Sequence, residues 1–150
     1  MRAGIRDYYI YDSILTPDAD WQLLAARLSG VRLFAHTYLP GKALAGGFAG
    51  FYTYDVYIHD GSSFPRVCAS ARKLGLVCAP SVGPGYDAVR ATGEMRVRDR
   101  AAGSRYDRMW RAAVRADADV VTITSYNEWH EGTQIEPARD VGTPYGPYEG

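Results

Sequence analysis

Two glutamates three residues apart, Glu128 and Glu131, stand in the polar segment Ser125–Ala138 (SYNEWHEGTQIEPA). Polar and aromatic side chains surround them, namely Asn127, Trp129, His130, Gln134 and Glu136. Carboxylates at this spacing are typical of acid/base chemistry at a C–O bond, where one keeps its proton while the other is ionised. Neighbouring charges push the two pKa values apart, and a nearby Trp or His can desolvate one carboxyl. A solvated polar loop is the competing interpretation, and spacing alone leaves both open.

Two further motifs point to other chemistry but are incomplete. His130-Glu131 begins an H-E-x-x-H pattern, but Gln134 stands where the second zinc ligand is needed, so we expect no metal site. Gly83–Ala88 (GPGYDA) matches the G-x-G-x-x-A pattern of dinucleotide-binding domains. The stretch after it is broken by Gly93, and no strand ending in an acidic residue lies about twenty positions further on. A tight turn is therefore the better interpretation, and we expect no cofactor.

Aromatic and basic side chains form two further groups. Tyr52 and Tyr54 end a predicted strand and share one face by its two-residue period, where they either pack in the core or face a ligand. The histidines at 36 and 59 are interpreted as structural. Six arginines between positions 90 and 108 predict a solvated, salt-bridged surface, with phosphate binding as the alternative.

These candidates lie on an alternating pattern of elements. Apolar runs predict five strands, at Gly4–Asp12, Val31–His36, Phe48–Tyr54, Leu76–Val82 and Val120–Ser125. Amphipathic patterns predict three helices, at Ala19–Leu28, Phe64–Leu74 and Ser104–Ala116. Alternation implies parallel strands and an α/β fold, either an open doubly wound sheet or a (β/α)8 barrel. Both place function at the carboxyl ends of strands, which selects residues 52–55, 81–87 and 125–136.

The composition restricts the class of protein. The chain has 150 residues, 47% of them hydrophobic, which is enough for a real core. Lys plus Arg and Asp plus Glu are 17 each, so the zero net charge argues against a nucleic-acid binder. No apolar run approaches the roughly 18 residues of a membrane span, and no leader is visible at Met1. Cys68 and Cys78 are interpreted as two ordinary buried thiols, with a disulfide as the alternative.

Several segments together resemble glycoside hydrolase family 99, the endo-α-mannosidases and endo-α-mannanases. The matching blocks occur in the family's order, and they are Tyr11–Ser13, the FYTY strand end, Ala79–Tyr86 (APSVGPGY), Arg98–Arg100 with Gly103 and Tyr106, and Ile123–Pro137 (ITSYNEWHEGTQIEP). The chain departs from the family at Ala91-Thr92-Gly93, where the family often has a Pro-Trp-Asn run. It departs again at Asp55, where the family tends to carry an aromatic residue.

The resemblance implies a (β/α)8 barrel and a retaining, metal-independent endo-hydrolysis of α-1,2-mannosidic bonds in glucosylated high-mannose N-glycans or mannans. It implies that Glu128 deprotonates the sugar 2-hydroxyl, giving a 1,2-anhydro sugar, and that Glu131 is the general acid/base. Substrate contacts are expected from Tyr52 or Tyr54, and from Tyr86, Asn127, Trp129 and His130. The implied partner is a mannose-containing oligosaccharide bound by a monomer. The implied compartment is the Golgi and secretory pathway in a eukaryote, or the periplasm or exterior of a bacterium.

The length does not fit a complete barrel, which needs roughly 250 residues. About five strands and three helices are found, and the signature lies on what would be the last or nearly last strand. The run Pro137–Gly150 is rich in Pro and Gly and stops before a closing helix. We therefore expect residues 1–150 to be the C-terminal portion of a single catalytic domain, inactive by itself. The alternative is a non-catalytic carbohydrate-binding or remnant fragment.

Overall fold

A computed structural model describes residues 4–137, so the end of the chain after Pro137, predicted to lack a closing helix, lies outside the described residues. The strands are β1 (Arg6–Ile10), β2 (Val31–His36), β3 (Gly50–Tyr52), β4 (Val77–Ala79), β5 (Ser81–Val82), β6 (Tyr86–Asp87), β7 (Val97–Arg98) and β8 (Thr122–Ile123). The α-helices are α1 (Asp18–Ala25), α2 (Pro40–Ala45), α3 (Phe64–Lys73), α4 (Val89–Thr92) and α5 (Ser104–Arg115). Short 3-10 helices are η1 (Ser13–Leu15), η2 (Ala101–Gly103) and η3 (Trp129–Glu131).

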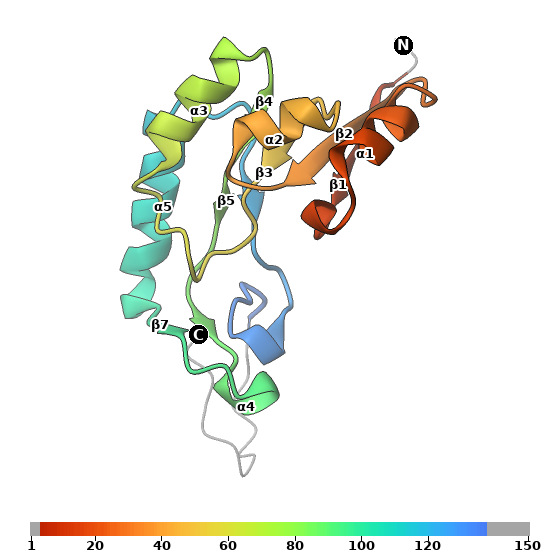
Figure 1. The fold of residues 1–150 in the computed structure, drawn as a ribbon. Helices are drawn as coiled ribbons and strands as arrows, with labels where there is room; N and C mark the ends of the chain where they lie inside the picture. Colours follow the sequence, from red (N-terminus) through yellow and green to blue (C-terminus); the bar gives the residue numbers. More distant parts are fainter. Residues whose placement is uncertain (1–3, 138–150) are drawn as a thin grey trace.

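All the strands except β6 and β7 pair in parallel (Figure 1). Four of them make a sheet in the order β1-β2-β3-β4, and β5 pairs in parallel with β8. The predicted strand Leu76–Val82 is divided at Pro80, because proline has no N–H to donate to a ladder. The last predicted strand is shorter than expected and is confined to Thr122–Ile123. The fold class is α/β, an incomplete (β/α)8 barrel, as predicted.

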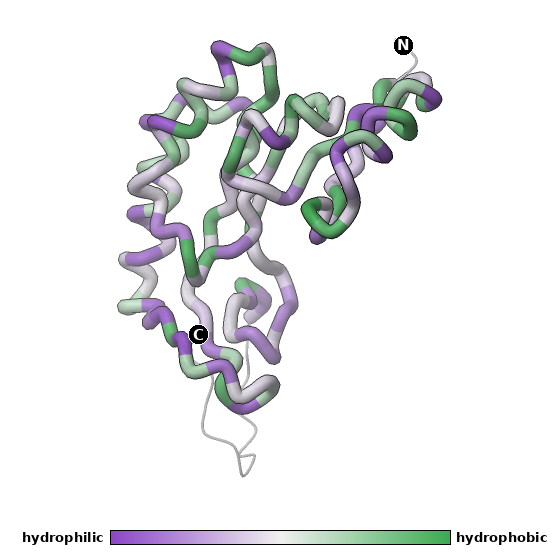
Figure 2. Tube along the Cα trace, in the orientation of Figure 1, coloured by the Kyte–Doolittle hydropathy of each residue, from purple (hydrophilic) through white to green (hydrophobic). Residues whose placement is uncertain are grey.

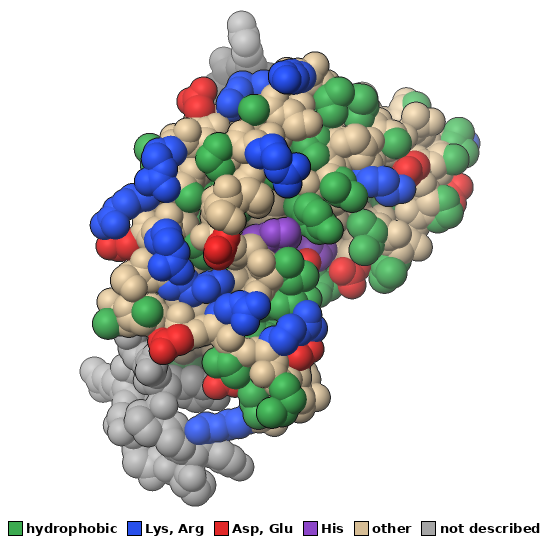
Figure 3. Space-filling view, turned by 60° about the vertical axis from the view of Figure 1, so that its left-hand side comes forward, with side chains coloured by type: hydrophobic (Ala, Val, Ile, Leu, Met, Phe, Trp, Pro, Cys, Tyr) green, Lys and Arg blue, Asp and Glu red, His purple; other side chains and the backbone are tan. Residues whose placement is uncertain are grey.

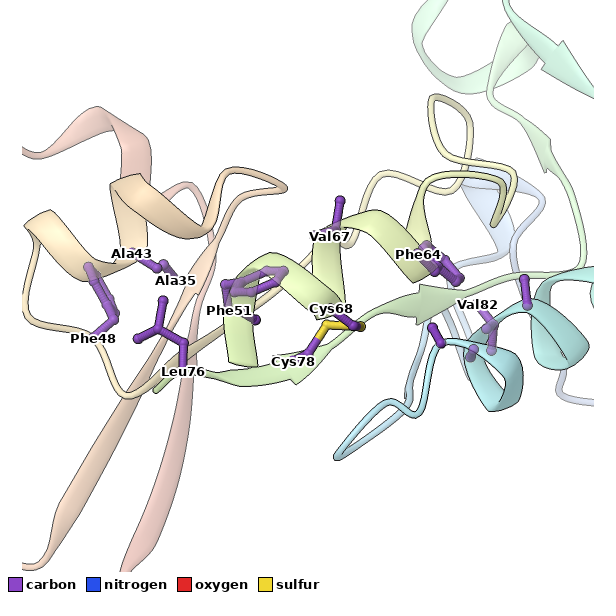
Figure 4. Close-up of a cluster of buried hydrophobic side chains, with 14 of the residues drawn as sticks. Ala35, Ala43, Phe48, Phe51, Phe64, Val67, Cys68, Leu76, Cys78 and Val82 are labelled. Carbon is purple, nitrogen blue, oxygen red and sulfur yellow. A yellow bond between two sulfur atoms is a disulfide. The ribbon is translucent and has the colours of Figure 1, made fainter. Parts of the chain in front are cut away.

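One hydrophobic core lies between the sheet and its helices (Figure 4). Phe51 of β3, Phe64 of α3 and Met109 of α5 are almost fully buried in it. Hydrophobic and hydrophilic residues alternate along α3 and α5, as expected for helices with one buried face (Figure 2). Because strand residues alternate, Phe34 and Tyr52 point to the opposite face, which in a barrel is the interior. The outer face is therefore covered by helices, and the inner face carries aromatic residues.

Cys68 and Cys78 form a disulfide, so the favoured interpretation as free thiols is wrong and the alternative is correct (Figure 4). Cys68 lies on the buried face of α3, and Cys78 points to the same core from β4. The connection between helix and strand returns the chain so that the two Cα atoms are 5.3 Å apart, within the usual range for a disulfide. The separation of ten residues in the sequence does not predict the disulfide, because the contact depends on the turn that ends α3.

The structure also contains elements that the sequence patterns missed. Helix α2 begins at Pro40, a residue favoured at the first helical position, and is only six residues long. Strands β6 and β7 form a short antiparallel pair on either side of α4. Elements of two to six residues are too short for a hydrophobic period to reveal them.

The first strand and helix are much less covered than the rest. Four of the five residues of β1 are exposed, and no residue of α1 is buried. Tyr8 is 48% exposed and Leu23 is 60% exposed.

None of the helices in the described part of the chain is both long and apolar enough to cross a membrane.

Candidate active site

Residues beyond the carboxyl ends of β1, β3 and β8 line one cavity of about 160 Å³. Tyr11 lies just beyond β1, Tyr54 just beyond β3, and Glu131 in η3 beyond β8. The cavity is lined by Tyr11, Tyr54, Asp55, Val56, Tyr57, Tyr86, Thr124 and Glu131. The structure therefore brings three predicted site residues together, and they are Tyr54, Tyr86 and Glu131.

The loop that carries the two glutamates is held at both of its ends. The Glu128 N–H donates to Ser125 Oγ at 2.9 Å, and the Ser125 and Thr133 hydroxyls lie 2.8 Å apart. The Ser125 N–H donates to the Thr133 carbonyl at 2.9 Å, which closes the base of the loop. The Arg100 guanidinium donates two hydrogen bonds of 3.0 Å to the Gln134 carbonyl. Glu128 and Glu131 are therefore presented by a fixed backbone rather than by a free loop.

Glu131 and Glu128 differ in burial. Glu131 is half-buried, and burial raises the pKa of its carboxyl, followed by the nearby negative charges of Glu128 and Asp55. Glu128 is exposed. A carboxyl with a raised pKa keeps its proton at a pH where ordinary carboxyls are ionised, which suits a general acid. The structure thus gives the two carboxylates unequal environments, as the acid/base interpretation requires.

Tyr54 follows the end of β3 and lines the cavity together with Glu131. Burial raises the pKa of its hydroxyl, followed by the charges of Glu131 and Glu128, so both carboxylates lie within electrostatic reach of it. Its backbone has a φ of 40°, and its N–H donates to Ser81 Oγ at 2.7 Å. Ser81 Oγ is in turn 2.7 Å from Thr122 Oγ1 of β8, which ties the end of β3 to the strand before the glutamates.

Tyr52 packs against Tyr54, which lines the Glu131 cavity. Its ring makes edge contacts with Tyr54 at 6.4 Å and with Tyr9 at 5.4 Å, and burial raises the pKa of its hydroxyl to about 12. It does not line the cavity. Of the two tyrosines that the sequence left open, Tyr54 is the one beside Glu131.

Trp129 and His130, which also belong to the segment Ser125–Ala138, line a second cavity of about 340 Å³. The cavity is lined by Tyr86, Asp87, Arg90, Ala91, Val97, Arg98, Asp99, Arg100, Trp129, His130, Gly132 and Gln134. Trp129 Nε1 donates to Glu136 Oε2 at 2.8 Å. Asn127 and Glu128 are exposed and line neither cavity. Tyr86 borders both cavities, so they adjoin there.

Five residues of the Glu131 cavity were not named as site residues from the sequence, although one of them, Asp55, lies in the selected segment 52–55. The five are Tyr11, Asp55, Val56, Tyr57 and Thr124. The rings of Tyr57 and Tyr86 lie 4.8 Å apart, which makes one wall of the cavity. Asp55 accepts a hydrogen bond from His36 Nε2 at 3.2 Å. Tyr11 follows the end of a parallel strand, as Asp55 does, and that position is the signal that could have identified it.

The alternative sites do not gain support. The glycine-rich turn is needed for packing, because a Cβ on Gly83 would lie 2.5 Å from the Thr124 carbonyl oxygen. It leads into β6 and the four-residue α4, which offers no long helix for a phosphate. Of the six arginines between positions 90 and 108, Arg96 pairs with Glu94, whereas Arg105 is buried and donates to the Val56 carbonyl at 2.8 Å. Basic and acidic side chains are intermixed on the face in Figure 3. The predicted salt-bridged surface therefore holds at Arg96 but not at Arg105. Within residues 4–137, no three His, Cys, Asp or Glu side chains converge as possible metal ligands.

Parallel strands, helices on the outer face and two glutamates beyond the carboxyl end of a strand define part of a (β/α)8-barrel domain of the glycoside hydrolase type. A family model for glycosyl hydrolase family 99 matches residues 3–145. The chain belongs to this family.

The relatives are endo-α-mannosidases and proteins named after them. The chain is 38% identical to a glycoprotein endo-alpha-1,2-mannosidase-like protein of Danio rerio, over 95% of this chain and 37% of that protein. It is 34% identical to the glycoprotein endo-alpha-1,2-mannosidase of Xenopus laevis, over 95% of this chain and 36% of that protein. The solved GH99 endo-alpha-mannosidase from Bacteroides thetaiotaomicron matches with a TM-score of 0.80 and 34% identity, over 89% of this chain and 45% of that one. The chain thus spans a little over a third of the relatives' length.

Proposed function

We propose that residues 1–150 are the C-terminal portion of the catalytic domain of a retaining, endo-acting glycoside hydrolase that cleaves α-1,2-mannosidic bonds. The substrates are glucosylated high-mannose N-glycans or mannans. Membership of family 99 and the names of the relatives support the reaction class. The observation that carries the proposal is Glu131, half-buried in a tyrosine-lined cavity beside a second, exposed glutamate.

In the proposed first step, Glu128 removes the proton from the 2-hydroxyl of the reacting mannose, and that oxygen attacks C1. The C1–O bond to the leaving sugar breaks, while Glu131 donates its proton to the leaving oxygen. A 1,2-anhydro sugar results. In the second step Glu131 deprotonates a water, which opens the anhydro ring at C1, and Glu128 returns a proton to O2. Two inversions at C1 give net retention, and the scheme uses no metal or cofactor.

The remaining predicted residues bind substrate in this scheme. Tyr54 and Tyr86 border the reacting sugar, and Tyr52 supports Tyr54 through its ring contact. Trp129 and His130 contact a further part of the oligosaccharide in the adjoining cavity, and Asn127 does so from the exposed loop. The partner is a neutral oligosaccharide rather than a nucleic acid, and the domain acts as a monomer.

A non-catalytic remnant is the second candidate. The exposure of β1 and α1 supports it, because a domain that lacks part of its barrel has an incomplete cleft. A partial parallel sheet also leaves apolar edges unpaired. This candidate keeps oligosaccharide binding but predicts no hydrolysis.

The test is endo-hydrolysis by the full-length protein that contains this chain. An α-1,2-linked mannose oligosaccharide should release a disaccharide or longer product of retained configuration, rather than single mannose units. Glu131→Gln should lower kcat by about two to four orders of magnitude with the fold intact. Asp117→Asn is the control, because Asp117 is 93% exposed and lies outside the Glu131 cavity. Near-normal turnover by Glu131→Gln would reject the catalytic assignment, and an inactive wild-type protein that still binds the oligosaccharide would favour the remnant.

A further inference from the structure

Asp55 is a cavity residue that the proposed reaction does not use. It follows Tyr54 directly and lines the Glu131 cavity, with its side chain 27% exposed. Its carbonyl oxygen accepts hydrogen bonds of 3.0 Å from the N–H groups of Ile58 and His59, which fixes its backbone in a turn. The position of the carboxylate is therefore determined by the fold beyond β3.

His36 fixes the orientation of this carboxylate. His36 Nε2 lies 3.2 Å from Asp55 Oδ2, and because a carboxylate only accepts hydrogen bonds, Nε2 is the donor. The other ring nitrogen, Nδ1, faces Asp12, with the Asp12 N–H at 3.3 Å and Asp12 Oδ1 at 3.5 Å. His36 is itself 7% exposed and stacks on Tyr11 with ring centroids 5.2 Å apart. Its N–H donates to Ser13 Oγ at 2.9 Å. A buried histidine held on both ring nitrogens thus leaves Asp55 little freedom to turn.

One carboxylate oxygen remains available. Asp55 Oδ2 accepts from His36, whereas Oδ1 accepts no hydrogen bond from the described residues. The lining of this cavity contains tyrosines and Glu131 but no Lys or Arg. An anion would be repelled by Asp55 and Glu131, whereas a neutral polyol can donate a hydroxyl to Oδ1 and pack against the rings. Tyr11, 59% exposed, offers such a ring at the side of the cavity.

We propose that Asp55, oriented by His36, accepts a hydrogen bond from a hydroxyl of the sugar in the Glu131 cavity and so determines which sugar fits there. This inference rests on the proposed function and adds a specificity-determining residue to it. A purely structural role, in which Asp55 only anchors His36, is the competing explanation. The two differ in one respect, because only the sugar contact makes the effect of Asp55 depend on a particular substrate hydroxyl.

The test uses the full-length protein and monodeoxy analogues of the oligosaccharide, each lacking one hydroxyl of the sugar in the cavity. Wild type should lose about ten- to hundredfold in kcat/KM on one analogue, the range for a hydrogen bond to a charged group. Asp55→Ala should lose a similar factor on the intact substrate, mainly through KM, and should no longer distinguish that analogue. Asp55→Asn, which keeps an oxygen acceptor, should lose less and guards against a folding defect in the alanine variant. Asp117→Asn is the matched control, because Asp117 is 93% exposed and remote from the cavity lining.

The outcomes separate this inference from the proposed function. If wild type hydrolyses the oligosaccharide but Asp55→Ala responds to every analogue as wild type does, the inference is wrong and the function stands. If His36→Gln raises KM without changing which analogue is penalised, His36 acts as the positioning residue, as proposed. If wild type neither binds nor cleaves any α-mannoside in calorimetry and product analysis, the function fails, and the inference fails with it.

Discussion

The two cavities that flank the signature segment differ in what surrounds them. The Glu131 cavity is small, lined by four tyrosines and two carboxylates, and has no basic side chain in its wall. The Trp129 cavity is about twice as large and is lined by three arginines, and its exposed residues include His130. Consecutive residues, Trp129, His130 and Glu131, thus contribute to different sites. If the proposed function is correct, this short segment separates chemistry from binding, because a 3-10 turn points neighbouring side chains to different sides.

The largest expected effect is the loss of kcat when Glu128, the neighbour of Trp129, is substituted. In the full-length protein Glu128→Gln should lower kcat by about two to four orders of magnitude, because the base toward the 2-hydroxyl is lost. Oligosaccharide affinity, measured by calorimetry, should change little. If Glu128→Gln instead raises KM at constant kcat, then Glu128 belongs with the binding cavity and the comparison is wrong.

Gly132 ends the η3 turn that carries both Trp129 and Glu131, and its substitution should damage both cavities. It has a φ of 62°, and an added Cβ would lie 3.0 Å from the Asp87 backbone nitrogen. Gly132→Ala should therefore shift Glu131 and Trp129 together and reduce kcat/KM by about a hundredfold, the loss typical of a misplacement near 1 Å. Steady-state kinetics should show kcat falling and KM rising. A change in only one of the two constants would mean that the cavities are independent.

Trp129→Ala tests the Trp129 cavity alone. Loss of an aromatic wall should raise KM about tenfold, which corresponds to 1.4 kcal/mol, while kcat stays within about twofold. Glu136→Gln is the matched control, because it alters the partner of Trp129 Nε1 but keeps the ring. A large fall in kcat in Trp129→Ala would place the tryptophan with the chemistry.

The pH dependence of kcat/KM should also distinguish the two cavities, although the expected effect is smaller. Burial and the charges of Glu128 and Asp55 favour the protonated form of Glu131 and raise its pKa. The acid is active when protonated, so kcat/KM should fall as the pH rises through that raised pKa. Asp55→Asn removes one of these charges and should move the alkaline limb to lower pH, whereas His130→Gln should leave the limb unchanged. An unchanged limb in Asp55→Asn would show that this charge does not act on Glu131.

Much of this arrangement follows from the sequence, but not all of it. Parallel strands and the position of the glutamates follow from apolar runs and from the rule that sites lie at carboxyl ends of strands. The choice between Tyr52 and Tyr54 did not follow, because Tyr54 lies beyond the end of β3 with a positive φ. The assignment of Trp129 and His130 to a separate cavity depends on η3, a turn of three residues without a readable period. The disulfide depends on how α3 and β4 meet, which no local pattern encodes.

The central claim is that Glu131 donates the proton to the leaving group and Glu128 removes one from the sugar. The most direct test compares Glu131→Gln and Glu128→Gln in the full-length protein on a substrate whose leaving group is fluoride, which departs without protonation. If the claim is correct, Glu131→Gln regains most of its lost rate in the first step, seen as a burst of fluoride, while Glu128→Gln stays slow. Equal rates for the two variants, or recovery in Glu128→Gln instead, would contradict it.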